Sequence, residues 1–497
     1  MSKPFQNKTI LSILDRYKDL WALSYTSAVA GWDLETYMPP LGASARGEAL
    51  GRLSTIYQKL FLERNFVALI HKASEEKNLS DQEKGVVRVL SHLLKSYEKI
   101  PPKFLEDYSL LTSRASVVWR EAKNTNNFKL FEPHLAKIFD MNRQMAEYVG
   151  YKDSPYDALL DQYEEELTSK EVENFFGEIK EPLKDLLGKI TTSKSYSKTH
   201  PLENAKYDKD KMEDLNNKVL QTLWPLYGQN FRLDVSAHPF TTSFSNQDTR
   251  ITTWYHETDF ARSLLSVVHE FGHALYDLQC ANELQMTPIG GGSSLVIHES
   301  QSRFWENFVG RSEGFIKYFK KDFDELFDSK QFSDISVQDY LAYFNKVSPS
   351  LIRTEADEVT YHFHIMLRYE IEKGIIENKL KVHDLPEIWN AKMKEYLGIT
   401  PKTDSEGVLQ DVHWSMGSIG YFPTYSFGTF LGAQWENLIE KNKAKNYKDM
   451  EKLLQKLIHR YGSTYTLEGL LKKNKMKFDP SVNLKYLEEK YGKIYGF

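Results

Sequence analysis

The segment 261-ARSLLSVVHEFGHALYDL-278 decides how the rest of this sequence is interpreted. Its apolar residues recur at spacings of three and four, which predicts an amphipathic helix. His269 and His273 stand four positions apart, so both imidazoles leave one face of that helix and can reach a single Zn²⁺ at about 2.1 Å. Glu270 lies beside them, where it suits a general base acting on water at the metal.

Two histidines and a carboxylate can also occur on an ordinary helix by chance. With 14 histidines and 69 acidic residues in 497 positions, chance gives this arrangement only about 0.05 times. The neighbours Val267, Val268, Phe271 and Leu275 are apolar, and burying idle imidazoles and an acid among them would be costly. The sequence therefore favours a metal site.

A catalytic zinc site needs three protein ligands and one open position. The stretch 298-HESQSR-303 supplies a third ligand, Glu299, after a glycine-rich turn at 290–294 that lets a second helix return beside the first. Glu306 is the competing candidate, because it lies seven residues later on the same expected helix face. Two histidines with one glutamate are typical of zinc enzymes that hydrolyse peptides.

The rest of the sequence predicts a mainly α-helical protein. Apolar residues follow helical spacing in several other long segments, among them Asp81–Lys99, Lys170–Lys189 and Asp449–Tyr461. The stretch Phe231–Tyr255 differs, because β-branched and aromatic residues alternate there with polar ones around a turn at 246–248. We expect a large helical globule with two lobes around a groove, and a small antiparallel β-sheet of two or three strands at Phe231–Tyr255.

Composition and charge exclude several classes of protein. The formal net charge is −5, which gives no support for nucleic acid or anionic membranes as the main partner. No segment has the roughly 18 nearly uncharged residues of a membrane span, and the N-terminus does not resemble an export signal. The single cysteine, Cys280, excludes an internal disulfide and a cysteine zinc cage, and it suits a reducing cytoplasm. We expect it to be a buried, inert thiol.

At this point the sequence resembles the carboxypeptidase Taq-type metallocarboxypeptidases. The resemblance covers most of the chain and rests on motifs in a fixed order. These are 32-WD-33 to 38-MP-39, 156-YDALLD-161, 238-HPF-240, 248-DTRIT-252, 269-HEFGH-273, 298-HESQ-301, 352-IRTEAD-357 and 407-GVLQDVHW-414. One departure occurs at residues 164–167, where the family commonly has a Pro-Gly turn and this chain has Glu-Glu-Glu-Leu.

The resemblance implies a carboxypeptidase that releases single residues from peptide C-termini, with broad specificity except at proline. It also implies a mainly α-helical fold with a small sheet beside a deep active-site groove. It implies one divalent metal ion per subunit, zinc with cobalt as the alternative, and a homodimer. It also implies a single metallocarboxypeptidase domain over residues 1–497, with a helical N-terminal lobe at about 1–200 and a catalytic lobe at about 201–497. From the single cysteine we expect a cytoplasmic protein.

An exopeptidase must recognise the terminal carboxylate of its substrate, and a buried arginine does this best. Arg353 in the IRTEAD motif is the first candidate, and Arg250 in the DTRIT motif is the second. Either arginine could instead form a structural ion pair, for which Asp357 is the obvious partner of Arg353 at helical spacing.

Other polar residues of these motifs are candidates for the substrate site. The transition state of peptide hydrolysis gathers negative charge on the carbonyl oxygen, and a nearby donor usually stabilises it. The candidate donors are His238, His413, Tyr421 and Tyr425. Asp357 and Asp411 could orient the imidazoles of the expected metal ligands by accepting a hydrogen bond from the ring nitrogen that does not bind the metal. Alternatively, they cap helices or pair with arginines.

Two other functions compete with this reading. A helical zinc endopeptidase can use the same ligands, and only a requirement for a free C-terminal carboxylate separates it from a carboxypeptidase. A binding or scaffold protein could hold a structural zinc ion. Such a site is normally closed by four ligands that include cysteine, which a single Cys280 and an unused Glu270 disfavour.

Overall fold

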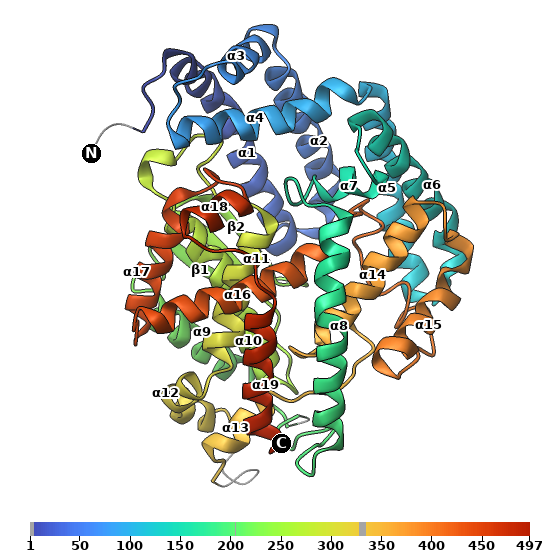
Figure 1. Cartoon of the computed structure of the whole chain (residues 1–497), viewed down its shortest axis with the longest axis vertical. Coiled ribbons are helices and arrows are strands. Elements are labelled where there is room, and N and C mark those ends of the chain that lie inside the picture. Colours follow the sequence, from blue (N-terminus) through green and yellow to red (C-terminus); the bar gives the residue numbers. More distant parts are fainter. Residues whose placement is uncertain (1–3, 204, 328–333) are drawn as a thin grey trace. The chain divides into compact units, whose positions relative to one another are not determined.

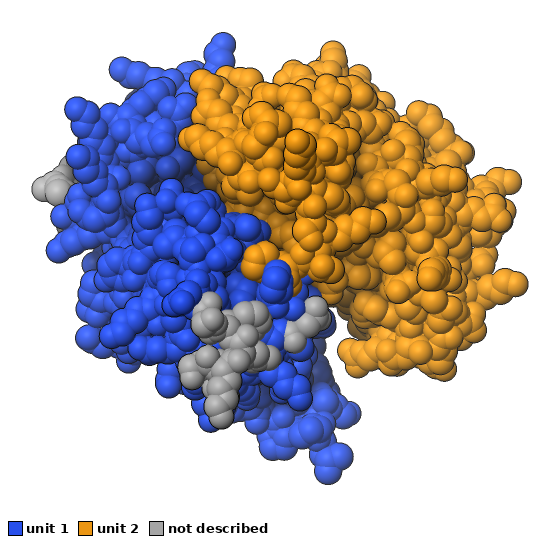
Figure 2. Space-filling model, turned by 90° about the horizontal axis from the view of Figure 1, so that it is seen from below, with its two compact units in different colours: residues 1–94, 201–344, 432–478 blue, residues 95–200, 345–431, 479–497 orange. Residues whose placement is uncertain are grey.

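The computed structural model describes residues 4–203, 205–327 and 334–497. The chain forms two compact units, and each contains segments that are distant in the sequence (Figure 2). Unit 1 comprises residues 1–94, 201–344 and 432–478, and unit 2 comprises residues 95–200, 345–431 and 479–497. The assignment of the whole chain to one domain with two lobes stays a prediction.

Unit 1 contains the predicted metal helix and the β-strands (Figure 1). Its long central helix is α10, Phe260–Leu278, which matches the helix expected from the sequence. The other helical elements of the unit are α1 (Lys8–Thr36), η1 (Pro40–Gly42), α2 (Ala43–Phe61), α3 (Arg64–Ser74), α9 (Lys209–Leu223), η2 (Asn282–Leu284), α11 (Leu295–Arg303), the π-helix η3 (Phe304–Gly310), α12 (Glu313–Asp324), α13 (Val337–Phe344), α17 (Tyr447–Leu457), η6 (His459–Tyr461) and α18 (Leu467–Lys473).

The strands β1 (Phe231–Val235), β2 (Thr241–Ser245) and β3 (Asp248–Thr253) form one sheet in the order β1-β3-β2. The sequence predicted an antiparallel sheet, and β2 and β3 do pair in this way around the expected turn. The pairing of β1 with β3 is parallel, so this part of the prediction is wrong. Residues 236–240 span two inter-strand gaps of about 4.8 Å each, which leaves room for β3 to insert between β1 and β2.

The position of α10 is fixed by its N-terminal cap and by the elements that pack against it. Asp259 caps the start of α10 by accepting a hydrogen bond from the backbone N–H of Arg262. Strands β2 and β3 pack on one side of the helix, and α11 and η3 pack on another. At Gly272 a Cβ atom would lie 2.5 Å from the backbone of Gln301 and Ser302, so only glycine allows α11 to approach this closely.

Among its described residues, unit 2 contains helices and connecting loops but no β-strand. Its core helix α14, Tyr361–Ile376, is buried along most of its length, and its buried residues include the charged Arg368 and Glu372. Two helices, α4 (Asp81–Lys99) and α16 (Pro423–Lys441), contribute residues to both units. The other helical elements are α5 (Pro102–Asn124), α6 (Phe128–Val149), α7 (Pro155–Leu160), α8 (Ser169–Thr192), η4 (Arg353–Glu355), η5 (Val382–Asp384), α15 (Leu385–Leu397) and α19 (Ser481–Tyr495).

The sequence motif at 156–161 has a structural role inside unit 2. Glu372 of α14 is fully buried and accepts hydrogen bonds from the Tyr156 hydroxyl at 2.7 Å, the Trp414 indole at 2.7 Å and the backbone N–H of Gly420 at 2.9 Å. These bonds tie three distant segments to one helix. Across the described part of the chain, no helix combines the length and apolar character needed to cross a membrane.

Candidate active site

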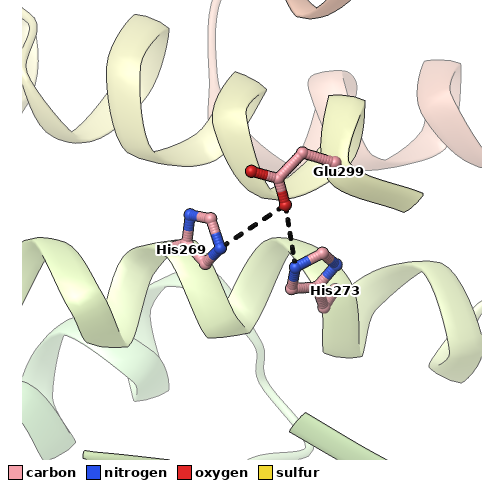
Figure 3. A group of neighbouring side chains, drawn as sticks. All are labelled: His269, His273 and Glu299. Atoms are coloured by element: carbon pink, nitrogen blue, oxygen red, sulfur yellow. Dashed lines mark ion pairs between the residues drawn. The ribbon is translucent and has the colours of Figure 1, made fainter. Parts of the chain in front are cut away.

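Helices α10 and α11 bring His269, His273 and Glu299 together (Figure 3). The Nε2 atom of His269 lies 3.7 Å from Oε2 of Glu299, and the Nε2 atom of His273 lies 3.4 Å from the same oxygen. Two ligands at about 2.1 Å from a tetrahedral ion are themselves about 3.4 Å apart. Two imidazole nitrogens and one carboxylate oxygen at this spacing fit one divalent cation of the zinc type.

Glu299 is held in the ionised form that a metal ligand requires. Its side chain is almost fully buried, Arg303 donates to Oε1 at 2.7 Å, and Ser302 donates to Oε2 at 3.0 Å. Burial alone would raise the pKa of Glu299, but Arg303 and the two imidazoles outweigh it and hold that pKa well below its usual range. The oxygen that faces the imidazoles is therefore available as a negatively charged donor.

Glu306, the competing candidate for third ligand, lies on the other side of the His269 ring. Its Oε2 atom is 2.9 Å from Nδ1 of His269, the nitrogen that faces away from Glu299. Arg303 and Arg311 also bond to its carboxylate, at 3.0 and 3.1 Å. The expected α-helical face does not extend to Glu306, because the wider π-helix η3 begins at Phe304 and changes the helical phase.

His273 is backed by a second imidazole, a contact that the sequence did not indicate. Its Nδ1 atom lies 2.8 Å from Nδ1 of His298, whose Nε2 atom lies 3.7 Å from Oδ2 of Asp277. If Nε2 of His273 binds a metal, its Nδ1 carries the proton, so Nδ1 of His298 accepts and the proton of His298 lies on Nε2. The His298 ring leaves room only for glycine at Gly292, where a Cβ atom would lie 2.6 Å away.

Glu270, the predicted general base, is largely buried and follows His269 on α10. The Thr241 hydroxyl, at the start of β2, donates a hydrogen bond of 2.6 Å to its Oε2 atom. The sheet and α10 therefore meet at this carboxylate. Thr241 stood outside the quoted motifs, and nothing in its local sequence signalled the contact.

The chain is similar to known metallopeptidases over nearly its whole length. Residues 12–491 match the model of one family, described as carboxypeptidase Taq (M32) metallopeptidase. The chain belongs to the M32 family. It is therefore a metallocarboxypeptidase, a peptidase of the hydrolase class, as the resemblance implied, and this family membership implies a divalent metal ion.

Individual M32 relatives are similar over most of their length. Thermostable carboxypeptidase 1 of Pyrococcus furiosus is 45% identical over 502 residues, which cover 99% of this chain and all of that protein. Carboxypeptidase 1 of Bacillus subtilis is 40% identical over 416 residues, or 82% of each chain. The structure of the Pyrococcus furiosus carboxypeptidase in an "Apo-Mg" form superimposes with a TM-score of 0.95, covering 98% of this chain and all of that one. The mainly α-helical fold is thereby confirmed.

Four of the candidate substrate residues of this M32 chain lie close together in unit 2. His413 Nε2 lies 3.3 Å from the Tyr425 hydroxyl, and its ring packs 5.5 Å from that of Tyr421. The Arg353 guanidinium lies 5.2 Å from the centre of the Tyr425 ring. Burial and the neighbouring Arg353 lower the pKa of His413 to about 4, so this imidazole is neutral at neutral pH.

Arg353 pairs with Asp411 and not with Asp357. Its Nε atom donates to Asp411 Oδ1 at 3.0 Å, and Arg368 donates to Asp411 Oδ2 at 2.7 Å. Asp357 accepts from the backbone N–H groups of residues 348, 359 and 360 and from the Thr360 hydroxyl. Asp357 is therefore an acceptor for backbone groups before α14, and Asp411 is an arginine partner. Glu306 and His298 are the residues that contact His269 and His273, the candidate metal ligands.

The remaining two candidates, Arg250 and His238, belong to unit 1. Arg250 forms a bidentate ion pair with Asp248 at 2.9 Å for both contacts, and its guanidinium lies 4.2 Å from the centre of the Trp32 ring. The His238 side chain is exposed, and its backbone carbonyl accepts a hydrogen bond of 2.6 Å from Ser236. Cys280 is buried, and burial raises the pKa of its thiol well above the usual value, which fits an inert cysteine.

Proposed function

We propose that this M32 enzyme removes single amino acids from the C-termini of peptides, with broad specificity except at proline. The proposal includes one divalent metal ion per subunit, zinc with cobalt as the alternative, held by His269, His273 and Glu299. The observation that supports it most is the approach of both Nε2 atoms to one oxygen of Glu299, at 3.7 and 3.4 Å. A requirement for a free C-terminus is the feature that experiment has to establish.

A divalent ion at these residues would supply Lewis acidity, which lowers the pKa of a water molecule towards about 7 and polarises the scissile carbonyl. Glu270 accepts the proton of the attacking water through its carboxylate and delivers it to the leaving amine. Its small exposed fraction, 8%, keeps bulk water from competing for this proton. The charge on Glu299 is neutralised in part by Arg303, which keeps the ligand in place.

Arg353 is the proposed anchor for the substrate carboxylate. Burial alone would lower the pKa of Arg353, but Asp411 and nearby tyrosines raise it, so the guanidinium stays charged. Charge-assisted bonds from a buried arginine suit recognition of a carboxylate. Arg250 is the second anchor in the proposal, and the proposed donors to the substrate are His238, His413, Tyr421 and Tyr425.

The location and assembly of the enzyme belong to the same proposal. We propose a cytoplasmic protein, because a chain with one cysteine needs no oxidising compartment. We also propose a homodimer, which rests on the resemblance to the M32 family alone. Size-exclusion chromatography with light scattering would test the dimer.

The decisive experiment is a mass-spectrometric time course on one peptide and its C-terminally amidated counterpart, using metal-loaded protein. We expect successive single losses from the free peptide only, abolished by a chelator and restored by Zn²⁺ or Co²⁺. Internal cuts in both peptides would show an endopeptidase instead. A second peptide with proline at its C-terminus tests the proposed exclusion of proline and is expected to remain intact.

The role of Glu270 is tested by Glu270→Gln, which keeps the shape of the side chain and removes its basicity. We expect the metal content to stay at the wild-type level while kcat falls by roughly 10²- to 10⁴-fold, the usual contribution of a general base. The exposed Glu283 on η2 supplies a matched control, Glu283→Gln, with unchanged kcat. Wild-type turnover in Glu270→Gln would rule out the general-base role.

A further inference from the structure

Thr241 lies on β2, outside α10, and contacts the Glu270 side chain. Its hydroxyl lies 2.6 Å from Oε2 of Glu270 and 3.0 Å from the backbone oxygen of the same residue. We infer, on the basis of the proposed function, that Thr241 is a positioning residue that orients the Glu270 carboxylate for proton transfer. Its hydroxyl acts on the reaction through Glu270 and not through the metal ligands.

The backbone around Thr241 is fixed by strand β3. Thr241 pairs with the buried Ile251 of β3, and the preceding residue, Phe240, exchanges two hydrogen bonds with Thr252. The Phe240 N–H donates to the Thr252 hydroxyl at 3.0 Å, and the Thr252 N–H donates to the Phe240 carbonyl at 2.9 Å. Ser236 adds a hydrogen bond of 2.6 Å to the same hydroxyl. The start of β2 is therefore held in place before Thr241 reaches α10.

This arrangement gives a physical role to two of the sequence motifs. The fully buried Thr252 is the last residue of the DTRIT motif, and Phe240 is the last residue of the HPF motif. Their mutual hydrogen bonds set the position of Thr241, the next residue along the chain. The two motifs thereby connect the central strand of the sheet to the carboxylate beside the predicted metal ligands.

The chemistry of the contact suits a carboxyl group that gains and loses a proton. A threonine hydroxyl has one hydrogen to donate, and an ionised carboxylate attracts it more strongly than a neutral backbone carbonyl does. With Oε2 engaged, Oε1 is the oxygen left to take the proton from water; among the described residues it accepts no hydrogen bond. Once Oε1 is protonated, Oε2 still accepts from Thr241, so the orientation survives both protonation states.

The test compares Thr241→Val, which removes the hydroxyl and keeps the shape, with Thr241→Ser, which keeps the hydroxyl. We expect Thr241→Val to lower kcat by about 10- to 100-fold, because a small displacement of a catalytic group has an effect of this size. The KM and the affinity for Zn²⁺ are expected to stay within about twofold, since neither substrate nor metal contacts Thr241 in the proposal. Thr241→Ser should restore kcat to within about threefold of wild type.

Two controls separate positioning from a structural role. Thr242 is the next residue of the same strand and points to the opposite face of the sheet, so Thr242→Val should leave kcat unchanged. In a Glu270→Gln background, Thr241→Val should change the residual kcat by less than about twofold, because the general base is already lost. A merely structural role would lower kcat equally in both backgrounds and would also lower the melting temperature of Thr241→Val.

The outcomes also separate this inference from the proposed function. Wild-type kcat in Thr241→Val, in an enzyme that shortens peptides normally, would overturn the positioning role and leave the carboxypeptidase proposal intact. If wild-type protein loaded with metal fails to shorten free peptides, the proposed function fails, and the positioning inference fails with it.

Discussion

At the level of single residues, the two imidazoles of α10 that are proposed to bind the metal have different partners at Nδ1. Glu306 contacts Nδ1 of His269 as a carboxylate, whereas His298 contacts Nδ1 of His273 as a second imidazole. A partner of this kind fixes the tautomer and the orientation of the ring that binds the metal. His298 is thus expected to affect the metal affinity without being a ligand itself.

The first prediction concerns His298→Phe, which keeps an aromatic ring against Tyr276 and removes the acceptor for His273. We expect the affinity for Zn²⁺ to fall by roughly 10- to 100-fold, the usual effect of removing such a partner. Competition with a fluorescent chelator measures it. The exposed His383 gives the control variant His383→Phe, which should bind Zn²⁺ normally. Equal affinities in all three proteins would refute the role of His298.

The second residue-level prediction tests the carboxylate anchor with Arg353→Ala. Because the anchor acts only on a free C-terminus, we expect kcat/KM on free peptides to fall at least about 100-fold, as for a lost charge-assisted pair. Any residual internal cleavage should change far less. A thermal melt must accompany the assay, because the substitution leaves Asp411 with Arg368 as its remaining arginine partner. Equal losses on free and amidated peptides would indicate a structural role.

At the level of elements, the close crossing of α10 and α11 sets the distance between the histidine pair and Glu299. Gly272 makes this crossing possible, because a Cβ there would lie 2.5 Å from the backbone of α11. Backbone atoms cannot move aside as a flexible side chain can. The helix pair must therefore separate if a larger residue is introduced.

The third prediction follows for Gly272→Ala. We expect it to destabilise the protein by about 1–3 kcal/mol through overpacking and to weaken Zn²⁺ binding, because Glu299 moves away from the imidazoles. The matched control is Gly188→Ala in α8, where a Cβ meets nothing within 4 Å. That change should stabilise the helix slightly, by up to about 1 kcal/mol. Normal metal binding by a folded Gly272→Ala protein would contradict the argument.

At the level of the whole molecule, each unit contains a histidine that stays neutral in the folded protein at neutral pH. Burial lowers the pKa of His459 in unit 1 to about 3, and burial with Arg353 lowers that of His413 in unit 2 to about 4, from an ordinary value of 6.5. Below pH 6.5 the unfolded chain therefore binds protons that the folded chain does not. Stability associated with these histidines is lost as the pH falls from about 6.5 towards 4.

The fourth prediction is a change in the pH dependence of unfolding in His459→Gln and His413→Gln. Glu372, whose pKa burial raises to about 7, acts in the opposite direction, so the difference between variant and wild type is the informative quantity. As the pH falls from 6.5 to 4.5, the free energy of unfolding should decrease more steeply in the wild type than in either variant. The difference in slope corresponds to up to about one bound proton for each histidine removed. Urea unfolding at three pH values measures this slope. Slopes that parallel the wild type in both variants would refute the prediction.

Sequence alone determined the features of this protein that depend on neighbouring residues in one element. The helix of α10, the shared face of His269 and His273 and the hairpin of β2 and β3 follow from periodicities of 3.6 and 2 residues, which are local properties of the backbone. The motif order also indicated the M32 family, which the family match confirms.

Tertiary structure decided the features that depend on how separate elements pack. Four such features join residues of different elements. They are the parallel pairing of β1 with β3 and the contacts of Glu306 with His269, His298 with His273 and Thr241 with Glu270. A hydrophobic pattern tells which face of an element is buried and restricts the register of a strand, but it does not choose the neighbouring elements. Those are fixed only when whole elements pack at close distance, as α11 does on Gly272.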